Sequence, residues 1–147
     1  MSLEENKALV RRAYEVGMNH KDMRVIDEVF AHDYVVRYPG VAPIRGLEAA
    51  KQALGAFLSA FPDMQFIVDD QLAEGDKVKT RWTGRGTHSG EYRGFPVATS
   101  VVPPSGRPVT FTATDIYRIV DGKIVEEWNT LETVVILQQI GVVTVPS

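Results

Sequence analysis

The sequence predicts an α+β domain in which three N-terminal helices cover one face of a curved, mainly antiparallel sheet. Apolar residues recur at helical spacing up to Phe61. From Met64 onward they alternate with polar residues, in runs joined by the turns Glu74-Gly75-Asp76 and Asp121-Gly122. Helices followed by hairpins are typical of α+β domains, and helices laid over a curved sheet enclose a cone-shaped pocket. With no repeat or linker, residues 1–147 are predicted to form one domain.

The first and third of the three predicted helices have clear start or stop signals. Ser2 and Glu5 form a capping box, which predicts a helix from there through about His20. A short second helix is predicted from the spacing of its apolar residues, Met23, Ile26, Val29 and Phe30. The third helix is expected to start at Gly46 and to stop at Pro62-Asp63.

The predicted strands occupy most of the remaining chain. A brief strand is expected at residues 33–38, before Pro39-Gly40. The longer strands are expected at residues 64–73, 77–85, 109–120 and 123–131, with the strongest turn signal at Asp121-Gly122. A closing helix is predicted at residues 133–140. The Gly-, Pro- and Ser-rich residues 87–108 are expected to form a long connection.

Composition and charge exclude several classes of function. The net charge is −3 and no basic stripe is present, which argues against nucleic-acid or anionic-membrane partners. No apolar run approaches the roughly 20 residues of a membrane span. The chain has no cysteine, so disulfides and thiolate chemistry are excluded. We expect a cytoplasmic protein.

The sequence also lacks the usual signatures of metal and nucleotide sites. His20, His32 and His88 are scattered and form no ligand-spaced cluster. No P-loop, complete GxGxxG fingerprint or GxSxG elbow is present. We therefore expect chemistry that needs neither a metal nor a nucleotide.

Asp115 is the strongest candidate for a catalytic residue. Residues 109–119 alternate strictly, and Asp115 falls on the apolar face, which otherwise carries Val109, Phe111, Ala113, Tyr117 and Ile119. Burial disfavours the charged form of a carboxyl group and raises its pKa toward the range useful for acid/base catalysis. The alternative is a structural carboxyl bonded to an Arg, Tyr or Trp of a neighbouring strand.

Several stretches make the chain resemble a known family. GDKVKTRWTGRGTHSGEYRGF, PPSGRPVTFTATDIYRIVDGKIVEEWNTLE and the ending LQQIG are similar to the SnoaL-like polyketide cyclase family, within the fold of nuclear transport factor 2-like proteins. Asn19 and the AFPD at Ala60–Asp63 extend the resemblance over nearly the whole chain. The chain departs from the family pattern at Val97–Val102, which lengthen a connection, and at Glu132, where aspartate is common.

The resemblance implies a function and roles for particular residues. In the cyclases, an aspartate on the strand before the DGKI turn removes a proton next to a carbonyl during an intramolecular aldol closure, without a cofactor; this role falls on Asp115. The GTH histidine corresponds to His88. The GKI-x-E-x-W motif corresponds to Gly122–Trp128. The outer sheet face commonly forms a homodimer in this fold, and Val125 and Leu131, alternating with Glu127 and Asn129, offer a mixed surface for such a contact.

Other residues are weighed as helpers or pocket lining. His88 could polarise a carbonyl or exchange protons with Asp115, or simply fix a turn. Trp128 is predicted to line the pocket on one strand face with Ile124 and Glu126, and Trp82 is either lining or core.

The remaining candidates divide into pocket lining and outer face. Residues that could line the pocket or fill the core are Tyr14, Tyr34, Phe57, Phe61 and Phe111. Arg81 is a minor candidate for holding an anionic substrate oxygen, in a row that otherwise reads as a solvated outer face. Glu126 could be a second acid, but pairing with Lys or Arg on the outer sheet face is favoured.

The sequence thus favours a small acid/base enzyme acting on an apolar, aromatic or polyketide-like carbonyl compound. Cyclase, isomerase and dehydratase versions use the same aspartate. The alternative is a non-catalytic ligand-binding or scaffolding module of the same fold.

Overall fold

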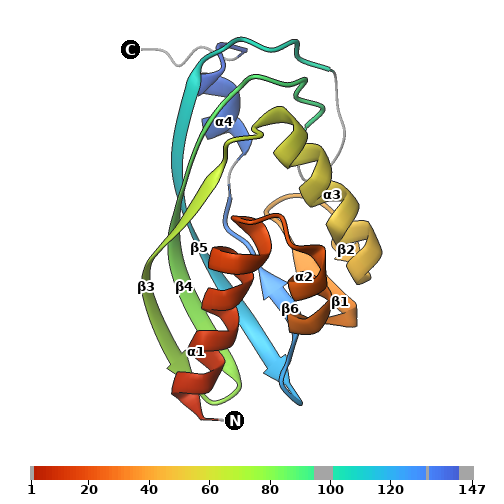
Figure 1. Cartoon of the computed structure of the whole chain (residues 1–147), viewed down its shortest axis with the longest axis vertical. Helices are drawn as coiled ribbons and strands as arrows, with labels where there is room; N and C mark the ends of the chain where they lie inside the picture. Colours follow the sequence, from red (N-terminus) through yellow and green to blue (C-terminus); the bar gives the residue numbers. More distant parts are fainter. Residues whose placement is uncertain (1, 95–100, 132, 143–147) are drawn as a thin grey trace.

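The computed structural model describes residues 2–94, 101–131 and 133–142, and a curved sheet dominates it (Figure 1). The strands are β1 (Phe30–Arg37), β2 (Ile44–Arg45), β3 (Gln65–Glu74), β4 (Lys77–Thr87), β5 (Pro108–Val120) and β6 (Lys123–Trp128). They form one sheet in the order β2-β1-β6-β5-β4-β3, so the sheet is open between β2 and β3.

The helices are α1 (Leu3–Arg12), α2 (Met23–Val29), α3 (Leu47–Ala60) and α4 (Thr133–Gln139). The predicted capping box is present, since Ser2 accepts from the Glu5 amide and Glu5 accepts from the Ser2 amide. α1, α2 and α3 pack over the hollow face of the sheet, which confirms the predicted α+β fold (Figure 1).

The first predicted helix changes form after Arg12. Residues Ala13–Met18 make a π-helical segment (η1), in which the amide of Asn19 bonds to the carbonyl of Tyr14. The side chain of Asn19 then bonds both the amide and the carbonyl of Phe66 on β3. These bonds fix the wide turn against the sheet and hold Tyr14 over its hollow face.

The sheet is mixed rather than wholly antiparallel. β3 to β6 pair antiparallel in sequence order, with the predicted two-residue turn at Asp121 (φ 51°) and Gly122 (φ 74°). β1 instead pairs parallel to β6, the last strand in the part of the chain that the structure describes. This parallel pairing and the two-residue strand β2 were not predicted, because pairing between distant segments leaves no local pattern in the sequence.

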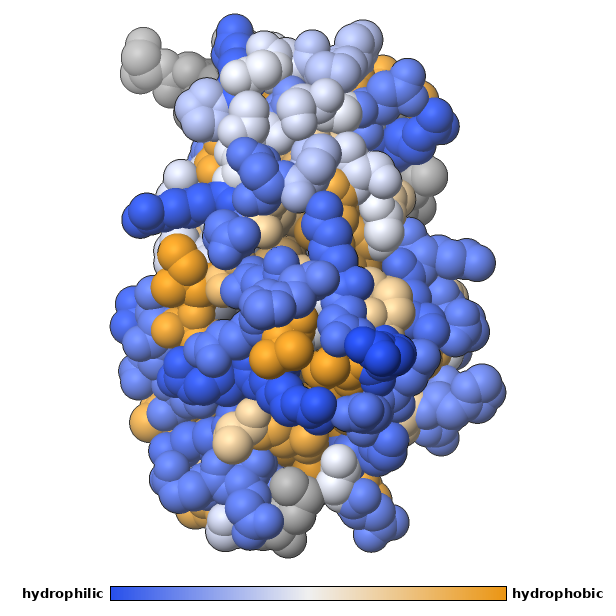
Figure 2. Space-filling view, viewed as in Figure 1, coloured by the Kyte–Doolittle hydropathy of each residue, from blue (hydrophilic) through white to orange (hydrophobic). Residues whose placement is uncertain are grey.

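The core lies between the helices and the hollow face of the sheet. The helical face of the molecule is mainly hydrophilic outside, with hydrophobic side chains showing between the polar ones (Figure 2). None of the helices in the described ranges is both long and apolar enough to span a membrane.

The connection between β4 and β5 is fixed at its described ends. The amide of His88 bonds to the carbonyl of Arg107, and Tyr92 pairs with Val102. Most of the predicted insertion at Val97–Val102, and Glu132, lie outside the described residues.

Candidate active site

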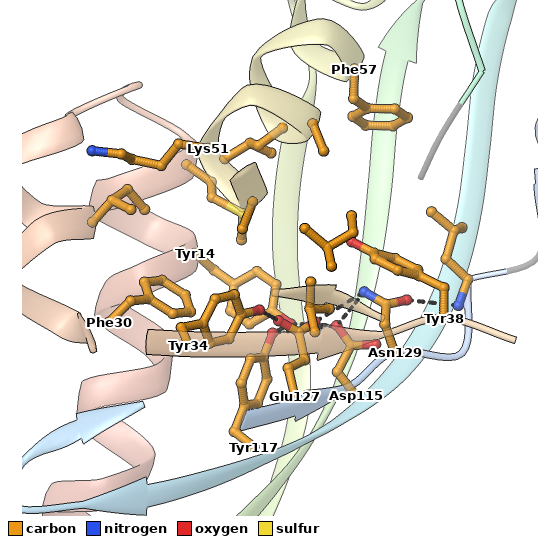
Figure 3. Close-up of a pocket in the computed structure, with 18 of the residues that line it drawn as sticks. Tyr14, Phe30, Tyr34, Tyr38, Lys51, Phe57, Asp115, Tyr117, Glu127 and Asn129 are labelled. Carbon is orange, nitrogen blue, oxygen red and sulfur yellow. Dashed lines mark hydrogen bonds between the residues drawn. The ribbon is translucent and has the colours of Figure 1, made fainter. Parts of the chain in front are cut away.

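A pocket with a cavity volume of about 90 Å³ lies between the helices and the hollow face of the sheet. α2 and α3 supply apolar walls, and the sheet supplies most of the polar groups (Figure 3). The lining is largely aromatic or aliphatic: Tyr14, Met18, Ile26, Phe30, Tyr34, Val36, Tyr38, Ile44, Leu47, Ala50, Ala53, Leu54, Phe57, Phe66, Trp82, Tyr117 and Leu131. The other lining residues are Lys51, Asp115, Glu127 and Asn129.

Asp115 lies at the sheet side of this pocket, on the face that the alternation predicts. It is 1% exposed, and residues 109 to 119 alternate between the interior and the outer face as expected. Its Oδ2 accepts hydrogen bonds from the Tyr14 hydroxyl (2.9 Å) and the Trp82 indole (2.9 Å). The Asn129 amide (3.2 Å) and the Tyr117 hydroxyl (3.3 Å) also donate to it.

Glu127 brings a second carboxyl group to the same place. It is 7% exposed, and the Tyr34 hydroxyl and the Asn129 amide (3.0 Å) donate to it. The one Asn129 amide nitrogen therefore donates to both Asp115 and Glu127, and the two acids lie on adjacent strands. Figure 3 shows the polar ends of these residues converging beneath the apolar walls.

A β-bulge in β6 turns Glu127 inward. Ile119 of β5 pairs with Ile124 of β6, and Arg118, the neighbour of Ile119, pairs with Glu126. Val125 is therefore an extra residue on β6 with no partner on β5. Val125 and Glu126 both face the outer side of the sheet, so the alternation between inner and outer faces shifts by one residue from there onward. Glu127, opposite Tyr117, then faces the pocket, and the outer-face position predicted for it is wrong.

Burial is the main electrostatic influence on the site. It raises the pKa of Asp115 well above its ordinary value, and the nearby charge of Glu127 raises that pKa further. Burial also raises the pKa of Glu127, although hydrogen bonds from Tyr34 and Asn129 oppose the rise. Burial raises the pKa of Tyr14, Tyr34, Tyr38 and Tyr117 in the same way, so all four hydroxyls stay protonated near neutral pH.

These raised pKa values predict a pH-dependent stability. Between the ordinary carboxyl pKa of about 4 and the raised folded-state values, the native state binds more protons than the unfolded state. The free energy of unfolding therefore falls as pH rises through this window. Denaturant titrations from pH 4 to pH 8 should show this fall in the wild type. A variant carrying both Asp115→Asn and Glu127→Gln should show a smaller fall; equal slopes would contradict the prediction.

The structure brings five of the predicted site residues together around the pocket: Tyr14, Tyr34, Phe57, Trp82 and Asp115. Phe111 is buried beside Trp82, with ring centroids 5.7 Å apart, and is not part of the lining. Phe61 is fully buried core. Arg81 is exposed on the outer face, as the solvated row of charges indicates.

His88 lies far from Asp115. Thr80 pairs with Asp115, and His88 follows Thr80 by eight residues along the extended chain, about 26 Å at 3.3 Å per residue. The imidazole is fully buried, and its Nδ1 accepts from the Ser105 amide. Burial lowers its pKa. The structure therefore contradicts a pairing of His88 with Asp115, and the turn-fixing alternative agrees with these bonds.

Trp128 faces away from the pocket because of the same β-bulge. It is partly exposed, and the guanidinium of Arg37 lies 5.9 Å from its ring centroid. Its predicted place in the pocket lining is therefore wrong. Glu126 bonds to Arg37 and Arg118, the outer-face pairing that the sequence favoured.

The sequence analysis missed Glu127, Asn129 and Tyr38, and it did not single out Tyr117. One signal for Glu127 was present. Adjacent residues of a strand face opposite sides, so the pair Glu126-Glu127 requires one carboxyl on the inner side whatever the phase. The sequence analysis assigned Glu126 to the same face as Ile124 by strict alternation, and the bulge at Val125 reverses which of the two glutamates faces inward.

The described residues contain no group of three or more His, Cys, Asp or Glu side chains placed to hold a metal ion. What the pocket offers is a buried pair of carboxyl groups, hydroxyl donors and apolar walls. Such groups can take a proton from a bound molecule and return it.

Comparisons with known proteins place this geometry in context. The family model for SnoaL-like polyketide cyclases matches residues 8–140. The chain is similar to IdmH from Streptomyces antibioticus, at 34% identity over 92% of this chain and 98% of IdmH, with a TM-score of 0.77. It is similar to AclR from Streptomyces galilaeus, at 29% identity over 99% and 87% of the two chains, with a TM-score of 0.82. TsrD from Streptomyces laurentii is 26% identical over 97% and 99%, with a TM-score of 0.80. The sequence matches no curated protein.

Proposed function

Because the chain belongs to the SnoaL-like polyketide cyclase family, we propose that it is a cofactor-independent acid/base enzyme acting on an apolar carbonyl compound. The observation that carries this proposal is the position of Asp115, a buried carboxyl group at the sheet side of an apolar pocket. Burial raises the pKa of Asp115 toward the working pH of an acid/base catalyst.

The proposed chemistry is proton removal from the carbon next to a carbonyl. Aldol cyclisation, isomerisation and dehydration all begin in this way. Asp115 moves the proton. A protonated hydroxyl such as that of Tyr14 or Tyr34, which donates to a carboxyl group in the free protein, turns its O–H to the enolate oxygen when the substrate is bound. This hydroxyl takes the electrophilic role that the sequence analysis offered to His88.

The lining of the pocket supports an aromatic or polyketide-like ligand. Phe30, Phe57, Phe66 and Trp82 offer flat apolar faces, and the polar groups gather at the sheet side. Among the relatives, IdmH is a candidate polyketide cyclase and AclR a candidate hydroxylase. The family therefore supports a small-molecule substrate more strongly than one reaction. The homodimer and the cytoplasmic location stay predictions.

Hydrogen exchange tests the proposal without the natural substrate. We expect the wild type to accelerate the exchange of α-hydrogens of an aromatic ketone, such as 2-tetralone, in D₂O, followed by proton NMR. The reason is that this exchange needs only a base near the α-carbon and a donor near the oxygen. The control is the uncatalysed rate in buffer.

A second candidate function has its own supporting observation. Oδ2 of Asp115 already accepts bonds from Tyr14, Trp82 and Asn129, as a purely structural carboxyl would. If the pocket binds aromatic ketones without accelerating exchange, the protein is a ligand-binding module and the enzymatic proposal fails.

A further inference from the structure

The proposed function uses Asp115 and leaves Glu127 unexplained. We propose that Asp115 and Glu127 hold one proton between them and act together as the acid and the base of one step, which makes Glu127 a second catalytic residue. This inference rests on the proposed function, because both carboxyl groups line the same pocket.

The unpartnered oxygen of Asp115 favours a proton between the two acids. Among the described residues, no donor group reaches Oδ1 of Asp115, although this oxygen is buried. The amide nitrogen of Asn129 donates to Oδ2 of Asp115 at 3.2 Å and to Oε2 of Glu127 at 3.0 Å, so the two carboxyl groups lie within reach of one donor. Ionised carboxylates only accept hydrogen bonds. A proton held by one member of the pair supplies the donor that the buried Oδ1 of Asp115 lacks.

The surroundings allow the pair one negative charge but not two. The titratable groups that face it are the hydroxyls of Tyr14, Tyr34, Tyr38 and Tyr117. Lys51 supplies the cation among the described lining residues, and Figure 3 shows its amine directed away from the carboxyl pair. This amine bonds to Asp27 and Glu48. No cation of the described residues forms an ion pair with Asp115 or Glu127, so a second charge on the pair would be uncompensated in a buried site.

The donors around the pair suit a single charge. Tyr14 and Trp82 donate to Asp115, Tyr34 donates to Glu127, and Asn129 donates to both. Asn129 itself is held in place because its Oδ1 accepts from the Leu131 amide at 2.7 Å. These fixed donors stabilise one carboxylate in either position, so the proton can move within the pair without other groups moving.

A shared proton makes the proposed chemistry balanced in charge. The ionised carboxyl of the pair removes a proton from the carbon next to a carbonyl. The C–H electron pair forms the new C–C bond to a second carbonyl carbon, whose π electrons move to its oxygen. That oxygen takes the proton that the pair already held. The pair ends the step with one proton, as it began, and needs no other acid or base.

Carboxyl NMR of the wild-type protein tests the sharing without any substrate. The chain is labelled with ¹³C at the aspartate and glutamate carboxyls, and Asp115 and Glu127 are assigned through bonds. If they share a proton, both carbons should respond in each of two well-separated titration steps, because coupled groups titrate as a pair. The sharing is overturned if each carbon titrates in one separate step near the surface carboxyls.

Exchange kinetics test the catalytic part. With 2-tetralone in D₂O, Asp115→Asn and Glu127→Gln should each lose about 10²- to 10⁴-fold in rate. The double variant should be no more than about tenfold slower than either, because residues acting as a unit are non-additive. Glu126→Gln, the same change one residue earlier on the outer face, should keep the wild-type rate.

These experiments distinguish a failure of the proposed acid/base function from a failure of the proposed role of Glu127. A wild type without exchange activity contradicts the proposed function, whatever the NMR result. A wild type with exchange activity that Glu127→Gln leaves intact overturns the catalytic role of Glu127 alone. Circular dichroism of each variant checks that a lost rate is not a lost fold.

Discussion

Asp115→Asn is expected to lower kcat/KM by about 10²- to 10⁴-fold, the usual contribution of a general acid or base. Asparagine has nearly the same shape and can accept the bonds from Tyr14, Trp82 and Asn129. Affinity for the ligand should therefore change little, because the pocket wall is preserved. The measurement is the exchange rate together with ligand binding by calorimetry. A variant that keeps more than a third of the wild-type rate would contradict a catalytic Asp115.

The same substitution should stabilise the protein at neutral pH. The asparagine Nδ2 can donate to Glu127, as a protonated Asp115 would, and the cost of burying a second ionisable group disappears. We expect a gain of about 1 kcal/mol, or about 3 °C in Tm. The matched control is Asp70→Asn, the same change at an exposed aspartate of β3, which should leave both the free energy of unfolding and Tm unchanged. Lower Tm for Asp115→Asn would show that the carboxylate stabilises the fold.

Gly90→Ala is expected to have the largest effect on stability. A Cβ at Gly90 would lie 1.9 Å from the backbone oxygen of Ser59, at the end of α3. The amide of Gly90 also bonds to the carbonyl of Ala60 at 3.1 Å, so the two segments cannot separate without losing this bond. We expect a loss of about 2–3 kcal/mol, or about 6–10 °C in Tm by calorimetry.

The control for this prediction is Gly55→Ala in the same helix. Gly55 is exposed within α3, and an added Cβ meets nothing within 4 Å. Alanine is the better helix former, so this variant should gain about 0.5–1 kcal/mol. Because α3 carries Leu54 and Phe57 into the pocket, Gly90→Ala should also weaken ligand binding. Equal Tm changes for the two variants would refute the close contact at Gly90.

The inner position of Asp115 could be predicted because it depends on a local rule. Residues 109–119 alternate without interruption, and the register between β4 and β5 is regular over its whole length. The phase of a regular strand follows from its own residues alone. The same reasoning explains why the capping box and the turn at Asp121-Gly122 were predicted correctly.

The orientation of β6 could not be predicted in the same way. Its phase changes at Val125, and no glycine or proline marks the bulge in the sequence. That one extra residue reverses the places of Glu127 and Trp128, and it removes Glu127 and Asn129 from the surface expected to form a dimer contact. The distance of His88 from Asp115 depends likewise on strand length and pairing, which residue type does not reveal.

The parallel pairing of β1 with β6 has a consequence for synthesis on the ribosome. Tyr14 and Asp115 are 101 residues apart, and Tyr34 and Glu127 are 93 apart, so the site around the carboxyl pair forms only when distant segments of the chain meet. A nascent chain that has emerged only to Val120 holds Asp115 but neither Glu127 nor Asn129. Contacts between segments so far apart in the sequence form slowly. The edges of β1 and β5 that pair with β6 therefore stay exposed to other chains until β6 has been synthesised.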